Sequence, residues 1–390
     1  MYKLAERMSR LGRETAFDVL VKAKGLEAQG RDIVHLEVGE PDFATPQNIV
    51  AAATHALQNG ATKYTPSAGI PELREAIARH VSATRGITVK PEQVVVTPGG
   101  KPIMFFVMLA MIDTGDEVLT PDPGFPIYES MIRFSGGKPV FYRLREENHF
   151  RFDPDEFARL VSDRTRLIII NSPQNPTGGV LEPDDLKVIA AIATARNIPV
   201  LSDEIYNEIL YDGTFSSLAS LPGMPERTII LDGFSKTYAM TGWRLGYGVM
   251  HESFAPHITQ LMNNSNSCTS ALTQWAGVEA LNGPQDEVRK MVAAFKERRD
   301  VIVEGLNQIP GFRCELPRGA FYAFPNITGV GWPSRKLADY LLQEAGVACL
   351  SGTAFGEYGE GYIRFSYANS LQNIHKALER VKQAVDKIRD

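Results

Sequence analysis

The sequence predicts an α/β fold: a large domain with a mostly parallel sheet covered by helices, and a smaller α+β domain. Short β-branched runs alternate with longer helical stretches over much of the chain, which indicates βαβ units. Residues 167–171 form a nearly continuous apolar run, as expected of a strand that is buried on both faces. The alternation ends near residue 284, and 390 residues are enough for two domains.

The expected strands of the large domain are rich in valine, isoleucine and leucine. They are residues 94–97, 117–120, 167–171, 199–202, 228–231 and 246–250. Helices are expected at 102–111, 127–134 and 184–196, and Pro102 suits a first helical turn. In open sheets of this kind, ligands bind outside the carboxyl ends of the strands.

The C-terminal part has a different pattern, with a long charged helix expected at 285–308 and an amphipathic helix at 370–388. Between them we expect extended segments at 312–314, 320–324 and 347–350, a helix at 334–345 and a strand at 362–367. No Ser/Gly-rich linker or internal repeat is evident, so the two domains are expected to join through helices.

Composition narrows the function classes. The net charge is −5 and no basic tract occurs, which argues against a nucleic-acid partner. The N-terminus lacks the apolar core of a signal peptide, and the strongly apolar run at 103–112 is far shorter than the roughly 20 residues of a membrane span. Cys268, Cys314 and Cys349 lie far apart and are expected to be unpaired thiols. We therefore expect a cytoplasmic protein without a membrane span.

The most informative motif is Ser235-Lys236-Thr237, which directly follows an expected strand and precedes Arg244 by a few residues. A lysine at a strand end is well placed to form a Schiff base with an aldehyde, and a nearby arginine can hold a phosphate in bidentate fashion. Pyridoxal phosphate carries both groups and is the cofactor that this pair suggests. The alternative is a solvated surface loop with two ordinary cations.

Three further motifs follow strands of the same sheet. Gly99-Gly100-Lys101 precedes a helix, where backbone N–H groups can approach a phosphate, although a plain tight turn is the alternative. Asn175 could donate a hydrogen bond to a phenolate oxygen or could belong to a simple turn. Asp203 could pair with a pyridinium nitrogen or could cap a following helix.

Three other residues leave a cofactor role and a structural role open. Tyr206 could donate to the cofactor O3′ or could be packing, and Phe125 could stack on the ring or belong to the core. Arg364 lies within the last expected strand, where a buried guanidinium needs a carboxylate. That carboxylate could belong to the protein or to a substrate. No cluster of metal ligands is apparent, so no metal is expected.

The order and spacing of these motifs resemble the class I/II aminotransferases of fold type I, which depend on pyridoxal phosphate. The resemblance runs from about residue 11 to the end and is most similar to the bacterial aspartate aminotransferase subgroup with a Gly-Gly-Lys turn. The matching segments are residues 39–43, 63–64, 69–74, 175–178, 202–206, 235–236, 240–244 and 364–366. The resemblance implies an N-terminal arm with part of the small domain at 1–44, a large PLP-binding domain at 45–284 and a C-terminal small domain at 285–390.

The resemblance also implies roles for single residues. Lys236 would be the Schiff-base lysine and proton shuttle, with Asp203 on the pyridine nitrogen and Tyr206 and Asn175 on O3′. Phe125 would stack on the ring, and Arg364 would clamp the substrate α-carboxylate with help from Gly39 and Asn175. The phosphate would be held by the turn at Gly99, Gly100 and Lys101, by Ser235 and Arg244, and by Tyr64 in the neighbouring subunit of a homodimer with shared active sites.

The expected activity is transfer of the amino group from an L-amino acid to 2-oxoglutarate or pyruvate by a ping-pong mechanism. A β-lyase on the same fold and a non-catalytic PLP-binding regulator are the alternatives. Aspartate is a candidate substrate because Lys101 stands where the subgroup binds a distal carboxylate. However, Pro102 and the Arg13-Glu14-Thr15 segment depart from that pattern. Since Phe105, Phe106, Phe125 and Phe321 could make the pocket apolar, alanine, branched and aromatic amino acids stay open.

Overall fold

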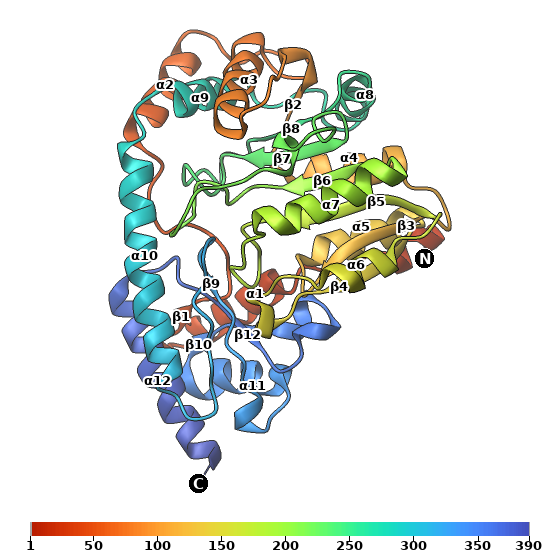
Figure 1. The fold of residues 1–390 in the computed structure, drawn as a ribbon. Coiled ribbons are helices and arrows are strands. Elements are labelled where there is room, and N and C mark those ends of the chain that lie inside the picture. The colour runs from red at the N-terminus through yellow and green to blue at the C-terminus, as the bar shows by residue number, and fades with distance from the viewer. Residues whose placement is uncertain (1, 390) are drawn as a thin grey trace.

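The central feature of the computed structural model, which describes residues 2–389, is a seven-stranded sheet in the order β2-β8-β7-β6-β5-β3-β4 (Figure 1). The strands are β2 (Val94–Thr97), β3 (Glu117–Asp122), β4 (Lys138–Arg143), β5 (Thr165–Asn171), β6 (Val200–Asp203), β7 (Thr228–Gly233) and β8 (Gly246–Val249). Pairs from β4 through β7 are parallel, so the predicted mostly parallel sheet is confirmed. Strand β8 is antiparallel to both of its neighbours.

Two local features of the sheet differ from expectation. No helix separates β7 from β8, and a connection without a crossover helix suits antiparallel pairing. Strand β4 was not predicted, because it is a half-exposed edge strand that starts next to two glycines and contains Pro139. All of the strands that were predicted for this sheet are present.

Helices cover both faces of the sheet (Figure 1). Ile168 and Ile170 of β5 pack in the cluster that includes α7 (Pro183–Arg196), whereas Leu167 and Ile169 pack in the cluster that includes α4 and α5. The alternation confirms that the apolar run at 167–171 is a strand buried on both faces. The other helices around the sheet are α4 (Lys101–Met111), α5 (Pro126–Ser135), α6 (Pro154–Leu160) and α8 (Ala255–Asn266).

The sequence analysis did not predict a group of helices that lies beside β2 and β8. It consists of α2 (Gln47–Gln58), α3 (Pro71–Arg85) and α9 (Ala271–Asn282), which lie together at the top of Figure 1. Ile49, Ala53 and Ala56 of α2 are buried at helical spacing, so the amphipathic signal was present. Helix α1 (Thr15–Glu27) was also missed, and it buries only Ala16 and Ala23.

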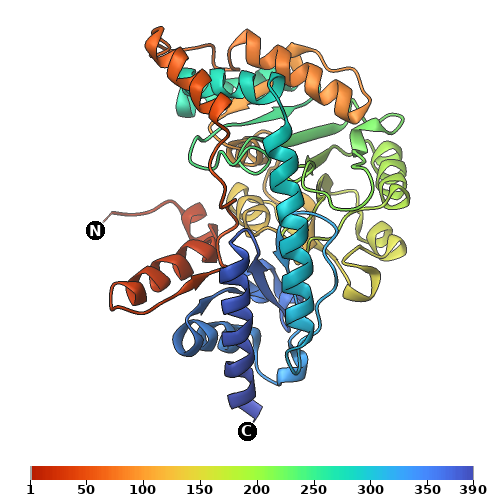
Figure 2. The same cartoon turned by 90° about the vertical axis from the view of Figure 1, so that its left-hand side faces the viewer.

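The C-terminal part is built around two long helices, α10 (Asp286–Asn307) and α12 (Leu371–Arg389), which lie side by side in Figure 2. Phe295 and Ile302 of α10 share a core cluster with Ile374 and Val381 of α12. Strand β1 (Val34–His35) pairs in parallel with β10 (Val347–Ala348), and the antiparallel sheet β11-β12-β9 contains Leu350–Ser351, Ile363–Ser366 and Tyr322–Ala323. The N-terminal segment therefore packs against C-terminal elements.

The predicted helix at 334–345 is present as α11 (Ser334–Tyr340) and a π-helical turn at Leu341–Ala345. The expected strand at 347–350 is split into β10 and β11, and 312–314 forms only a single bridge between Arg313 and Asn326. Short 3-10 turns complete the chain at Glu6–Arg10, Pro91–Gln93, Glu146–Asn148, Leu218–Ser220, Thr328–Val330, Gly352–Phe355 and Glu357–Gly359.

The three cysteines are unpaired, with Cys314 and Cys349 buried, as the sequence predicted. Across residues 2–389, the helices lack the combination of length and apolar character that crossing a bilayer requires.

Candidate active site

A cavity of about 460 Å³ lies at the carboxyl ends of β5, β6 and β7 and at the start of α4. Its wall contains most of the predicted site residues, namely Gly39, Gly100, Lys101, Phe125, Asn175, Asp203, Tyr206, Ser235, Lys236, Arg244 and Arg364. A larger cavity of about 780 Å³ lies elsewhere, beside Arg166, Arg196 and His257, and contains none of them. The chemistry-bearing residues therefore meet in the smaller cavity.

Parallel pairing places the carboxyl ends of β5, β6 and β7 at the same edge of the sheet. Asn171 pairs with Asp203 in register, and Asp203 pairs with Leu231, so the loop that carries Lys236 emerges beside both carboxyl ends. The side-chain amide of Asn171 donates to the backbone oxygen of Asp203 at 3.0 Å, and its oxygen accepts from the backbone N–H of Asn175 at 3.0 Å. Asn171 thus fixes the loop that carries Asn175 against the end of β6.

The amine of Lys236 is partly shielded from water. Its Nζ donates to the backbone oxygen of Gly39 at 2.5 Å. Burial lowers the pKa of Lys236 from 10.5 to about 8, because a charged ammonium is poorly solvated there. A much larger fraction of the amine is therefore neutral, and hence nucleophilic, near physiological pH than for an exposed lysine.

Asp203 lies buried at the end of β6. Its Oδ2 accepts from the hydroxyl of Tyr128 at 2.6 Å, and its Oδ1 accepts from the backbone N–H of Ile205 at 3.3 Å. Burial raises the pKa of Asp203 to about 6, and a cation placed beside the carboxylate would favour its charged form. A turn rather than a helix follows Asp203, so the helix-cap alternative is wrong.

Tyr206 belongs to that turn, and its hydroxyl lies 2.7 Å from the hydroxyl of Tyr322 on β9. Burial raises the pKa of both phenols, so both stay protonated and able to donate. A Cβ on Gly39 would lie 2.0 Å from the Tyr322 hydroxyl oxygen, so only glycine fits at position 39. Strand β9, from the C-terminal part of the chain, therefore contributes directly to this part of the wall.

Arg364 is 3% exposed on β12, and its nitrogens contact only neutral acceptors. Its Nη1 donates to Asn175 Oδ1 at 2.9 Å, and its Nη2 donates to the backbone oxygen of Glu37. Its Nε has no hydrogen-bond partner, and within residues 2–389 the guanidinium forms no ion pair with a carboxylate. Since a buried cation needs a counter-ion, this arrangement favours an anionic ligand over the internal ion pair that the sequence left open.

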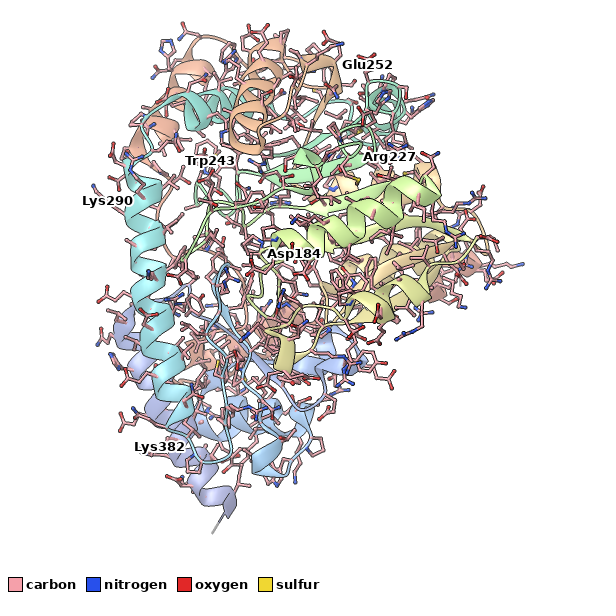
Figure 3. The ribbon with its side chains drawn as sticks, in the orientation of Figure 1. Asp184, Arg227, Trp243, Glu252, Lys290 and Lys382 are labelled. Atoms are coloured by element: carbon pink, nitrogen blue, oxygen red, sulfur yellow. The ribbon has the colours of Figure 1, made fainter. Side chains whose placement is uncertain are left out.

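The end of the cavity at α4 suits a phosphate. Gly99 has a φ of +87°, and a Cβ there would lie 2.1 Å from Nη2 of Arg244. Helix α4 starts at Lys101, directly after Gly100, so its first backbone N–H groups and dipole lie beside that arginine. Trp243, labelled in Figure 3, donates from Nε1 to Thr45 Oγ1 at 2.9 Å, which anchors the loop that carries Arg244.

Lys101 also forms an ion pair with Glu14, which lies in the cavity wall but was not among the predicted site residues. Phe17 and Phe125 flank the lysine, with ring centres 5.8 and 5.5 Å from its Nζ.

Two predicted residues lie outside the wall of the cavity. Gly99 lies against the guanidinium of Arg244, and Tyr64 is 88% exposed. The sequence analysis did not predict Tyr128 and Tyr322 as site residues, and it named Glu14 only as part of a segment that departs from the aspartate pattern, without giving it a role. Tyr128 could have been found, since it lies one helical turn after Phe125. Nothing in the sequence near Tyr322 or Glu14 indicates that these residues reach the strand ends.

Comparison with known proteins identifies the family. The family model of the class I and II aminotransferases matches residues 31–381. The chain belongs to this family. An aspartate aminotransferase of Pyrococcus horikoshii is 40% identical over 387 residues, which cover 99% of this chain and 98% of that protein. The protein is therefore a transaminase that uses pyridoxal phosphate.

Solved structures agree with this assignment. The aspartate aminotransferase of Thermus thermophilus with maleate has a TM-score of 0.95 at 38% identity and covers 98% of this chain and 100% of its own. An alanine aminotransferase of Pyrococcus furiosus has a TM-score of 0.94 at 34% identity and covers 99% of this chain and 100% of its own. The predicted fold of type I is thus confirmed, on a scaffold that relatives use for different amino acids.

Proposed function

We propose that this aminotransferase binds its cofactor and substrate in the 460 Å³ cavity, with Lys236 as the covalent attachment point and proton carrier. The observation that carries the proposal is the convergence of three groups on that cavity. Lys236 has a lowered pKa, and within residues 2–389 the buried carboxylate of Asp203 has no cation beside it and the buried guanidinium of Arg364 has no carboxylate. A pyridinium nitrogen and a substrate carboxylate would supply the two missing charges.

The residues present fit pyridoxal phosphate. Asp203 would hold the ring nitrogen, Phe125 would lie on the ring face, and Gly100, the backbone of Lys101, Ser235 and Arg244 would hold the phosphate, with Gly99 leaving room for Arg244. Tyr322 can donate to Tyr206, which leaves the Tyr206 proton for the cofactor O3′. Asn175 accepts from Arg364 through Oδ1, which leaves its Nδ2 to donate to O3′ as well.

Lys236, Gly39 and Arg364 then have separate roles in the reaction. When bound, pyridoxal phosphate stabilises negative charge at the substrate α-carbon. The neutral Lys236 amine removes the α-proton and later returns a proton, and the oxygen of Gly39 orients its Nζ. Arg364 holds the α-carboxylate so that the α-hydrogen faces Lys236. An amino acid leaves as its 2-oxo acid before pyruvate or 2-oxoglutarate binds, which gives ping-pong kinetics.

We also propose a homodimer in which Tyr64 reaches the phosphate of the partner's site. Figure 2 shows the N-terminal segment, in red, with helix α1 projecting from one side of the chain. Apolar side chains are exposed on this segment, including Tyr2 at 96%, Leu4 at 71% and Val21 at 71%. A second copy of the chain would cover this surface and would place the exposed Tyr64 within a complete site. We place the enzyme in the cytoplasm because its cysteines are free.

We further propose the division into an arm with part of the small domain at 1–44, a large domain at 45–284 and a small domain at 285–390. The parallel pairing of β1 with β10 supports the first segment, and the start of α10 at Asp286 supports the second boundary.

Lys236→Ala tests the central assignment. The variant should fold, bind pyridoxal phosphate without a covalent link, and lose at least about 10⁴-fold of its transamination rate, since the proton carrier is gone. Transfer is measured as 2-oxo acid formation from a panel of amino acids with pyruvate and 2-oxoglutarate. Lys290→Ala, on the exposed face of α10 (Figure 3), is the matched control and should keep full activity. Full activity in Lys236→Ala would refute the assignment.

A further inference from the structure

Two charged side chains of the cavity wall neutralise each other. Lys101, the first residue of α4, donates to Oε2 of Glu14, which directly precedes α1. The Glu14 and Lys101 side chains are 21% and 44% exposed, so the pair is partly shielded from water. Because the two residues come from distant parts of the chain, folding itself brings them together.

The charge of Glu14 reaches the reacting groups. Burial lowers the pKa of Lys236, and the negative charges of Glu40 and Glu14 oppose that shift. Burial also lowers the pKa of Arg364, with Glu14 among the groups that oppose it. Glu14 therefore lies within electrostatic reach of both the amine and the guanidinium that we assign to the substrate.

The cavity thus offers a very different environment to each end of a substrate. Within residues 2–389, Arg364 has no carboxylate partner, and its Nε makes no hydrogen bond. Lys101 is already paired with Glu14, and the rings of Phe17 and Phe125 flank its Nζ. A substrate with a second carboxylate would have to displace Glu14 from Lys101 or lie beside a like charge, and either arrangement disfavours its binding. An apolar side chain would instead contact the two rings without a charge penalty.

We propose that Glu14 is a specificity-determining residue that selects amino acids and 2-oxo acids with one carboxylate and an uncharged, largely apolar side chain. The inference rests on the proposed function, since it assigns the α-carboxylate to Arg364. It excludes aspartate and glutamate as preferred donors, and it favours pyruvate over 2-oxoglutarate as the acceptor. Glu14 neutralises the charge of Lys101, which is therefore not available to bind a distal carboxylate of the substrate.

Binding of unreactive acids to the cofactor-loaded enzyme tests selection without turnover. Calorimetry would compare 4-methylpentanoate, succinate and 6-aminohexanoate, which are the skeletons of leucine, aspartate and lysine without the α-amino group. We expect 4-methylpentanoate to bind about tenfold more tightly than succinate, which corresponds to about 1.4 kcal/mol. Equal or tighter binding of succinate would overturn the proposal, and so would tightest binding of 6-aminohexanoate, since Glu14 would then be a receptor for a cation.

Removal of the charge at position 14 tests whether Glu14 causes the selectivity. Glu14→Gln should improve succinate binding relative to 4-methylpentanoate by about tenfold. The same substitution in a Lys101→Met background should give no such gain, because the freed cation is absent. Asp18→Asn removes an exposed carboxylate one turn further along α1 and should leave the ratio unchanged. A ratio that stays within twofold of wild type in Glu14→Gln would refute the role of Glu14.

These outcomes are separable from failure of the proposed function. If no amino acid were transaminated, the proposed function would fall, while the order of the three acids would still report on Glu14. Conversely, rapid transamination of leucine together with preferred binding of succinate would retain the function and refute the selectivity.

Discussion

At the residue scale, the reactivity of Lys236 follows from its surroundings. Desolvation disfavours its ammonium form, and the Arg364 and Lys101 charges add to this effect, while Glu40 and Glu14 oppose it. Burial prevails, and the pKa falls to about 8. An ordinary exposed lysine, with a pKa of about 10.4, would be neutral in fewer than about 1 in 100 molecules at pH 8.

A pH dependence follows for the cofactor-free protein. Only the neutral amine attacks the cofactor aldehyde, so the rate of covalent capture should rise with pH and level off above a midpoint near 8. Stopped-flow absorbance between pH 6.5 and 10.5 measures this rate. Nα-acetyl-lysine, which titrates near its usual pKa of about 10.4, serves as the reference. A midpoint near 10 for the protein would show that burial does not activate Lys236.

The sequence predicted the site residues that lie at or just after the carboxyl ends of strands. Lys236, Asp203 and Asn175 follow strands of one parallel sheet, and that topology brings their side chains into one cavity. Tyr322 and Glu14 could not be predicted, since they enter the cavity from β9 and from the segment before α1 through tertiary packing. The single roles of Lys236, Asp203 and Arg364 stay predictions until variants are measured.

At the element scale, a buried network ties α3 to the strands that carry the site. Arg85 donates from Nε to Glu204 at 3.0 Å and from Nη2 to Asp232 at 2.7 Å, and all three side chains are nearly inaccessible to solvent. Glu204 directly follows Asp203, and Asp232 lies on β7, which leads to Lys236. The Arg85 guanidinium therefore fixes the ends of β6 and β7 relative to each other.

Arg85→Met should leave two uncompensated buried carboxylates and lower the free energy of unfolding by about 3–5 kcal/mol. Urea denaturation of the cofactor-free protein measures the effect. Arg79→Met removes an exposed arginine from the same helix and should change stability by less than about 0.5 kcal/mol. If the two variants were equally stable, the network would contribute little to the position of the strand ends.

Several elements with strong local signals were predicted, although α2 and α3 were missed despite an amphipathic pattern in α2 and a starting proline in α3. The buried strand β5 and the helix α7 have the apolar runs and the flanking prolines that mark such elements. Strand β4 lies at the sheet edge, and its half-exposed residues give a weak pattern. The long helix α10 was predicted within two residues of its observed ends, because its charged and apolar positions keep a helical period.

At the scale of the whole molecule, the proposed dimer completes the site. The protein should sediment at twice the chain mass. Tyr64→Phe should weaken cofactor binding by about tenfold or more, because one hydrogen bond to a charged phosphate is lost. Fluorescence titration measures this affinity. Tyr358→Phe, which alters a 42%-exposed tyrosine outside the cavity, is the control. A monomer with unchanged affinity in Tyr64→Phe would contradict the shared site.

The account depends most on the covalent bond between Lys236 and the cofactor. Borohydride reduction of the cofactor-loaded protein, followed by peptide mapping, locates that bond directly. We expect one pyridoxyl group per chain on the peptide that contains Lys236, and none on Lys101 or on the exposed Lys290. A label on another lysine, or no label on a fully loaded protein, would contradict the account.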